Sequence, residues 1–239
     1  MKRICLISTV SMTLEAFVLD AVKTLHEIHP DWEITFACRG DDRFAASLPP
    51  YIRFVPIRME RGISLSGLTA VSQMKKLFSE NRFDLVQYAT PNASLYASIA
   101  AKRTKVPVRL YCQWGIRYVG FEGMARRVFK RLEKTVCRNS THIRAVSFLN
   151  KRFAVEEGLY PEEKAVVLGQ GGTIGVDLEE YDLSKKEEWR EKIRSRYQLG
   201  DGVVFGFVGR ISRDKGSEEL LAAFRSIHAH NPSAKLLMV

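Results

Sequence analysis

Two cations stand in a short polar loop near the end of the chain, between a predicted strand and a predicted helix. The apolar run 203–208, rich in β-branched and aromatic residues, predicts a buried strand that ends at Gly209. Arg210 and Lys215 follow, and a helix with acidic residues in its first turn begins directly afterwards. Arginine supplies a planar fork of N–H donors, lysine supplies a point charge, and a helix N-terminus adds backbone N–H groups. This arrangement predicts a phosphate-binding loop, and the alternative is an ordinary strand–helix turn with exposed cations.

The elements that would position this loop alternate between strand and helix along the whole chain. The predicted strands are 3–8, 33–38, 52–56, 84–88, 108–112, 142–147, 164–168, 203–208 and 235–239. The predicted helices are 13–28, 64–80, 92–103, 122–138, 148–157, 185–197 and 217–230. Such alternation predicts parallel sheets joined by helical crossovers, with ligands bound beyond the carboxyl ends of the strands.

Several segments together resemble the retaining glycosyltransferases of family four. The run Phe207-Val208-Gly209-Arg210, followed by Asp214-Lys215-Gly216, is similar to the opening of the second domain of these enzymes. The other similar segments are 84–88 with Thr90-Pro91, 106–111 with Trp114-Gly115, Ala145-Val146-Ser147, and Gly175-Val176-Asp177 with Tyr181. The resemblance covers nearly the whole chain, and it rests on the order and spacing of the segments.

The resemblance implies an α/β fold of the GT-B type, in which two Rossmann-like domains face each other across the active site. It also implies that Arg210 and Lys215, beside Gly209, contact the diphosphate of a nucleotide-sugar donor. These cations would then stabilise the negative charge that develops on the departing diphosphate.

Three predicted parts divide the chain on this reading. They are an N-terminal acceptor-side domain over 1–168, a hinge and linker helix over 169–200, and a donor-binding domain over 201–239. Since the chain finishes inside a predicted strand, we expect a complete first domain and only the first βαβ part of the second. Glycines in the middle part predict either a hinge or a close approach of the backbone to a ligand. The hinge glycines are Gly171, Gly172 and Gly175.

Hydroxyl and aromatic side chains stand at unusual places on the acceptor side. Ser11 and Thr13 replace a glycine-rich loop that is frequent in the family, and they would cap the first helix or bind a sugar acceptor. Trp114, before Gly115, replaces a frequent histidine, and both a core tryptophan and a platform for a sugar ring are open. Ser147, at the end of a predicted strand, is a further acceptor-side candidate. No residue is assigned as a catalytic base.

The net charge of +10 favours anionic partners. The densest basic segment is the predicted helix 122–138, which is expected to carry its cations opposite one apolar side. The residues of that apolar side are Met124, Val128, Phe129, Leu132 and Val136. A core helix with a solvated basic face and a helix that lies on an anionic membrane both fit this pattern. A nucleic-acid partner is not expected, because no recognition motif accompanies the charge.

Four cysteines are far apart in the sequence and form no Cys-x-x-Cys pair, which predicts buried reduced thiols. No segment has the spacing of metal ligands, and Asp41-Asp42 is expected to be a solvated turn. We therefore expect neither a metal nor a cofactor, with the nucleotide-sugar as co-substrate. The first apolar run is too short for a signal peptide, so the expected location is the cytoplasm, with membrane contact limited to its surface.

The combined expectation is a hexosyltransferase that moves a sugar from a nucleoside-diphosphate donor to a lipid-linked or saccharide acceptor in surface glycan synthesis. Two other classes stay open. The chain could be a non-catalytic fragment that binds an acceptor or a partner, or a basic nucleic-acid-binding protein.

Overall fold

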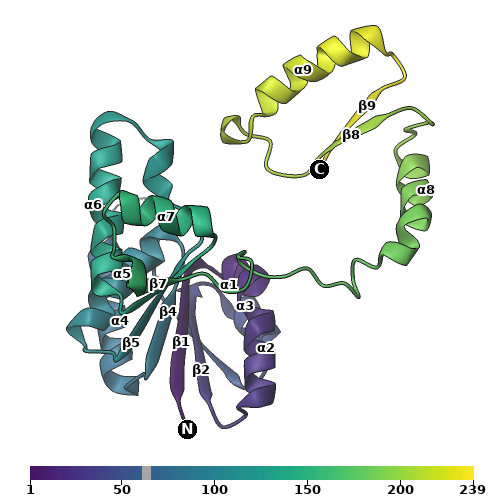
Figure 1. The fold of residues 1–239 in the computed structure, drawn as a ribbon. Coiled ribbons are helices and arrows are strands. Elements are labelled where there is room, and N and C mark those ends of the chain that lie inside the picture. Colours follow the sequence, from purple (N-terminus) through teal and green to yellow (C-terminus); the bar gives the residue numbers. More distant parts are fainter. Residues whose placement is uncertain (61–65) are drawn as a thin grey trace. The chain divides into compact units, whose positions relative to one another are not determined.

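The structure, a computed structural model, describes residues 1–60 and 66–239. Strands and helices alternate through these residues (Figure 1). The chain divides into two compact units, Met1–Gly175 and Val176–Val239. The boundary falls inside the predicted hinge segment 169–200, and the hinge role of that segment stays a prediction.

The first unit contains one sheet of seven parallel strands in the order β3-β2-β1-β4-β5-β6-β7. The strands are β1 (Arg3–Val10), β2 (Glu33–Arg39), β3 (Ile52–Pro56), β4 (Leu85–Tyr88), β5 (Val108–Gln113), β6 (His142–Ala145) and β7 (Ala165–Val166). The strand order runs outward in one direction from β1 and in the other from β4, so the β1–β4 pair is the topological switch point of the sheet.

Helices cover both faces of this sheet, as parallel sheets require. They are α1 (Ser11–Phe17), α2 (Leu19–Ile28), α3 (Asp42–Ser47), α4 (Ser66–Asn81), α5 (Pro91–Arg103), α6 (Gly123–Asn139) and α7 (Phe148–Glu156). Figure 1 shows α1, α2 and α3 on one side of the strands and α4, α5 and α6 on the other. The predicted helix 64–80 begins in residues that lie outside the described part of the chain.

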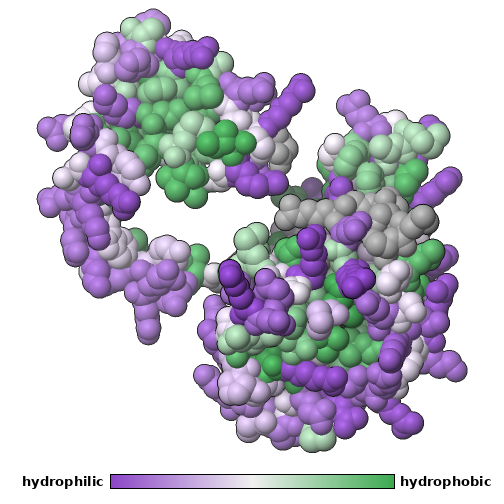
Figure 2. Space-filling view, turned by 180° about the vertical axis from the view of Figure 1, so that it is seen from behind, coloured by the Kyte–Doolittle hydropathy of each residue, from purple (hydrophilic) through white to green (hydrophobic). Residues whose placement is uncertain are grey.

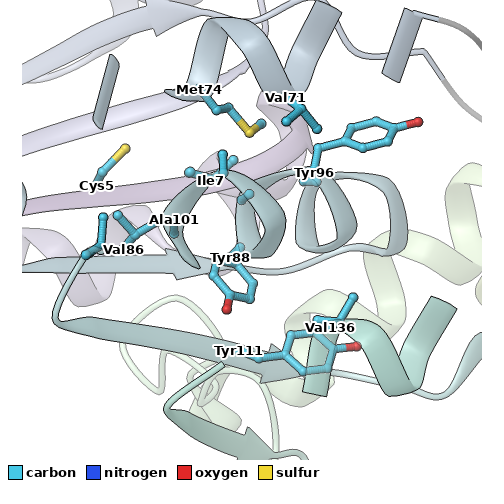
Figure 3. Packing of buried hydrophobic residues seen from close by; sticks show 14 of the residues in the cluster. Cys5, Ile7, Val71, Met74, Val86, Tyr88, Tyr96, Ala101, Tyr111 and Val136 are labelled. Atoms are coloured by element: carbon cyan, nitrogen blue, oxygen red, sulfur yellow. The ribbon is translucent and has the colours of Figure 1, made fainter. Parts of the chain in front are cut away.

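Alternation along β1 divides the core between the two faces. Ile4 and Leu6 belong to the cluster under α1–α3, whereas Cys5 and Ile7 belong to the cluster under α4–α6. Figure 3 shows the second cluster, in which Met74 of α4 approaches the strand residues. Each fully buried side chain of this size contributes about 1.5–3 kcal/mol to folding.

All four cysteines are free thiols buried in this unit: Cys5, Cys38, Cys112 and Cys137. Burial raises the pKa of Cys38 and of Cys112 to about 12. The prediction of buried reduced thiols is confirmed, and the cysteines act as small apolar side chains.

Two local predictions are wrong, and one of the two alternatives for Ser11 and Thr13 is not found. The helix expected over 13–28 is two helices, because the backbone leaves the helical region at Val18, where φ is −132°. The turn expected at Asp41-Asp42 starts helix α3, and the Asp41 side chain caps it by accepting from the N–H of Phe44 at 3.1 Å. Helix α1 begins after Val10, and no side chain in the described part of the chain caps it, so the capping role expected for Ser11 or Thr13 is not found.

The apolar side expected for helix 122–138 also needs correction. Val136 is buried and Phe129 packs against the core, but Met124 is 69% exposed and Val128 is 40% exposed. These two residues therefore share the outer face of α6 with its cations. The buried side of the helix includes the carboxyl group of Glu133 instead.

The second unit contains α8 (Lys186–Arg196), β8 (Val204–Phe207), α9 (Ser217–His230) and β9 (Lys235–Met238). Strands β8 and β9 pair in parallel, and α9 connects them along the chain. Figure 2 shows apolar side chains gathered on one face of this unit. The exposed apolar residues of β8, α9 and the adjoining loops include Val203, Phe205, Val208, Leu221 and Ile227.

A close contact between two backbones requires glycine at the end of the first unit. The N–H of Gly172 donates to the carbonyl oxygen of Val146, just after β6, at 2.7 Å. Gly171 has a φ of +95°, and a Cβ atom there would lie 2.6 Å from the same oxygen. The sequence predicted either a hinge or a close approach of the backbone to a ligand in this segment. At Gly171 the structure shows a close approach to the carbonyl group of Val146.

Replacing Gly171 by alanine should lower the free energy of unfolding of the first unit by roughly 1–3 kcal/mol, because the new Cβ meets backbone at a strained φ. The matched control is Gly175→Ala, where a Cβ atom would meet open space and no positive φ is present. Urea denaturation compares the two variants, and equal stabilities would show that the Val146 contact is not held in solution.

Candidate functional site

A polar cavity of about 300 Å³ lies at the topological switch point of the first sheet. Its lining residues end β1, lie in α1, open α5 or start the 3₁₀ turn Arg117–Gly120 after β5. They are Thr9, Val10, Thr13, Thr90, Pro91, Asn92 and Arg117. Because β1 and β4 have their helices on opposite faces, a crevice opens between their carboxyl ends. We call this cavity the switch-point pocket.

Two threonines hold the two sides of the switch-point pocket together. The hydroxyl oxygens of Thr9 and Thr90 are 2.7 Å apart, and the N–H of Thr9 donates to the Thr90 hydroxyl oxygen at 3.0 Å. Thr90 has a φ of +68°, which is unusual for a β-branched residue and costs about 1–3 kcal/mol. The hydrogen bonds from β1 hold Thr90 in this conformation at the start of α5.

Arg117 supplies the cationic group of the switch-point pocket. Its guanidinium lies 5.0 Å from the ring centroid of Phe129 and 5.8 Å from that of Phe121. Cation–π attraction therefore positions the group, while within the described residues it forms no ion pair. A pocket with hydroxyl groups and one guanidinium can bind a polyhydroxylated ligand.

A buried polar network lies behind Arg117. Glu133 of α6 borders a smaller cavity that Arg117 also lines. Its Oε1 atom accepts from the Tyr111 hydroxyl at 2.9 Å and from the Gln113 amide at 2.7 Å. The Tyr160 hydroxyl donates to the Gln113 amide oxygen at 2.8 Å. These bonds fix the end of β5, from which the Arg117 turn departs.

Burial raises the pKa of Glu133, and the hydrogen bonds from Gln113 and Tyr111 oppose that shift. The folded-state pKa thus lies above the ordinary value of 4.5. The contribution of this group to stability is fully present below pH 4.5 and is lost as the pH rises through the folded-state pKa.

The predicted acceptor-side residues do not form one cluster. Thr13 lines the switch-point pocket, but Ser11 is not among its lining residues. Trp114 packs with the cluster under α1–α3, with its ring centroid 5.5 Å from that of Phe17. The Ser147 hydroxyl accepts from the N–H of Asn150 at 3.0 Å and so caps α7.

The remaining acceptor-side candidate, Gly115, is exposed, and a Cβ atom there would meet open space. For Trp114, the packing against Phe17 fits the core alternative, and a platform role stays a prediction.

The predicted donor loop lies in the second unit, between β8 and α9. Gly209 has a φ of +156°, and its N–H donates to the carbonyl oxygen of Val239 at 2.9 Å. Arg210 is exposed, and Lys215 ends a 3₁₀ turn, Arg213–Lys215, that leads into Gly216. Both cations thus stand in one loop, at the carboxyl end of a strand and before a helix N-terminus, as predicted from the sequence. Their contact with a diphosphate stays a prediction.

Sequence reasoning missed Arg117 and Glu133. Arg117 could have been found as a cation in a loop that follows a predicted strand, which is where ligands bind in such sheets. Glu133 carried no signal, because it stands among cations on a helix that was expected to bury only apolar groups. In the described part of the chain, no group of three or more histidine, cysteine or acidic residues is placed to hold a metal ion.

Replacing Glu133 by glutamine should make stability less dependent on pH. The free energy of unfolding of the unaltered protein should fall as the pH rises above about 4.5, whereas the variant should follow a flatter curve. Urea denaturation from about pH 4 to pH 8 measures the difference. Glu163→Gln, at an exposed position, is the control, and a Glu133→Gln curve parallel to that of the control would contradict the burial of this carboxyl group.

Solved structures share the fold at low sequence identity. The crystal structure of HepE from Anabaena in complex with UDP and glucose matches with a TM-score of 0.71 and 18% identity, covering 100% of this chain and 61% of that one. A glycosyltransferase from Rickettsia africae matches with a TM-score of 0.67 and 15% identity, covering 99% of this chain and 68% of that one. The expected α/β fold of the GT-B type is confirmed.

A sequence relative is more similar. The capsular polysaccharide biosynthesis glycosyltransferase CapM of Staphylococcus aureus is 35% identical over 186 residues, which are 77% of this chain and 48% of CapM. The chain thus spans about half the length of this curated relative. The model of a family described as glycosyl transferase 4-like matches residues 3–147, more than half of the chain. By this match the chain belongs to the glycosyl transferase 4-like family.

Proposed function

We propose that this chain is part of a glycosyltransferase of capsular or other surface polysaccharide synthesis. The observation that carries the proposal is the 35% identity to CapM across 77% of the chain. The reaction would transfer a hexose from a nucleoside-diphosphate donor to a lipid-linked or saccharide acceptor, with retention at the anomeric carbon.

The donor loop is proposed to hold the diphosphate of the nucleotide-sugar. Arg210 and Lys215 would stabilise the negative charge that grows on the diphosphate as its bond to the sugar breaks. Two cations placed there can do the work that a divalent metal does in other enzymes, so the proposed reaction needs no metal. The complex of HepE with UDP and glucose makes uridine diphosphate the first probe to use.

The switch-point pocket is proposed to bind the acceptor. Its volume of about 300 Å³ suits one sugar unit, and the Thr13 hydroxyl and the Arg117 guanidinium offer hydrogen bonds. The hydrogen-bonded pair of Thr9 and Thr90 gives this pocket a fixed wall. Rigid walls lower the entropy that an acceptor loses when it binds.

Contact with an anionic membrane surface is proposed for the outer face of α6. Met124 and Val128 are exposed there beside the cations, and such a face can insert its apolar groups between lipid headgroups. Among the helices of the described residues, none is long and apolar enough to cross a membrane.

Replacing Arg210 or Lys215 by alanine should weaken the binding of uridine diphosphate. Each replacement should also raise the barrier to sugar transfer by roughly 2–4 kcal/mol, because a charge-stabilising group is lost. Calorimetry measures binding by the 239-residue chain, and transfer is measured with and without EDTA on a full-length protein that contains this chain. The control is Arg213→Ala, at an exposed cation of the same loop. Folded variants that bind as well as the unaltered chain would remove the diphosphate assignment, and loss of transfer in EDTA would remove the metal-free mechanism.

Replacing Met124 and Val128 together by glutamine should reduce flotation with vesicles that contain phosphatidylglycerol, because apolar contact with the lipid is lost. Leu68→Gln, at an exposed leucine of α4, is the control. Equal flotation of all three proteins would show that α6 does not contact the membrane through these residues.

A further inference from the structure

A second cavity, of about 600 Å³, lies beside α6 and takes no part in the proposed binding of donor or acceptor. The second half of α6 forms one wall, and the segment 158–164, between α7 and β7, forms the other. Four cations line this cavity: Arg131, Lys134, Arg138 and Lys164. No acidic side chain is among its lining residues.

The place of this cavity separates it from the switch-point pocket. Arg138 stands just before β6 and Lys164 directly before β7, so both lie toward the amino ends of the strands. Thr9 and Thr90 of the switch-point pocket stand at the carboxyl ends of β1 and β4. A ligand in the second cavity would therefore leave the switch-point pocket open.

The cations of α6 gather on one stripe of the helix. Arg131, Lys134 and Arg138 are three and four positions apart, which places them above one another on one face. Like charges at this spacing repel, so the helix is destabilised unless an anion lies between them.

Three carboxylates of α6 and of the chain between α7 and β7 have other partners. Glu162 pairs with Lys151 at 3.6 Å. Glu133 is turned to the buried side of α6, where it accepts from Tyr111 and Gln113. Glu157 pairs with Lys130 at 2.8 Å and lies 3.8 Å from Arg126. Within the described residues, the three cations of the stripe form no ion pair with a protein carboxylate.

Lys164 is held in place at the end of α6. Its ammonium group donates to the carbonyl oxygen of Cys137 at 2.7 Å. The negative end of the helix is thereby covered by a cation, so a ligand at this end of the cavity meets an ammonium group rather than a bare carbonyl.

Apolar groups form the remaining part of the lining. Leu159 and Tyr160 are buried, and Pro161 stands beside them. The Tyr160 hydroxyl is already bonded to Gln113, so the tyrosine is held in place. A cavity with several cations and an apolar base fits a phosphate group attached to a small organic residue, since phosphate offers several acceptor oxygens to converging cations.

We propose that this cavity is a binding site for a phosphate group, carried by a phospholipid headgroup or by a small phosphate ester in solution. It does not depend on the donor or acceptor assignments. The guanidinium groups of Arg131 and Arg138 and the ammonium group of Lys134 hold the phosphate oxygens. The base formed by 159–161 contacts the attached organic group.

The test compares two charge-neutralised proteins of equal net charge. The cavity variant is Arg131→Gln/Lys134→Gln/Arg138→Gln, and the control variant is Lys75→Gln/Lys102→Gln/Arg103→Gln, at exposed helical cations outside the cavity. Calorimetry with glycerol 3-phosphate is the soluble arm, and flotation with phosphatidylglycerol vesicles is the lipid arm. Thermal unfolding followed by circular dichroism verifies that both variants fold.

We expect binding by the unaltered chain and by the control variant, and binding at least about tenfold weaker in the cavity variant. A selective loss in the soluble arm supports the proposal, because the outer face of α6 has no membrane to contact in that arm. A selective loss in the lipid arm alone would overturn the proposal, because membrane contact by the cations of α6 would give the same result. Equal losses in the two variants would overturn the proposal, because only net charge would then matter, and absence of binding in both arms would overturn it as well. The part of uridine diphosphate binding that Arg210→Ala removes, measured on the same variants, should not change, which keeps this outcome separate from that of the donor loop.

Discussion

The pairing of β1 with β4 is the constraint on which the first unit depends. A parallel sheet buries both faces, so its crossover helices must be divided between two sides. The division occurs at this pair, and the alternating side chains of β1 supply both cores at once. The same division leaves the carboxyl ends of the two strands without a covering helix, which produces the crevice that Thr9 and Thr90 line. The reversal of strand order at β1 and β4 thus provides both the two buried cores and the opening for a ligand.

The buried network around Glu133 extends this constraint to the neighbouring strand. Tyr111 and Gln113 lie on the same face of β5, and both donate to one carboxylate oxygen from α6. Burying a carboxyl group costs free energy unless its oxygen atoms accept hydrogen bonds. The two hydrogen bonds to Glu133 also align α6 with the end of β5. The Arg117 turn begins four residues after Gln113, so its position depends on this alignment.

Local patterns predicted the strands and most helices well, because hydrophobic periodicity and turn residues act over a few positions. Helix α3 was missed because its signal is one capping aspartate before six residues. The break at Val18 was missed because an apolar helix pattern continues across it.

The donor loop is contiguous and could be found from its motif. The switch-point pocket joins Thr9 to Thr90, 81 positions apart, and only the strand order brings them together. Side-chain placement such as the outward position of Met124 depends on the rotation of α6 against the sheet, which composition does not determine.

The four thiols have a further consequence. Cys5, Cys38, Cys112 and Cys137 stand in β1, β2, β5 and α6, and all are at most 1% exposed. Reaction with a disulfide reagent requires that the thiol is ionised and that the reagent can reach it. Burial raises the pKa of all four thiols and also keeps the reagent away from them. Each cysteine therefore becomes reactive only when the strand or helix that carries it separates from its neighbours. The labelling rate of each thiol can be measured on the peptide that contains it. These rates would compare how readily the β1–β2 side and the β5–α6 side of the first unit open, with no added probe.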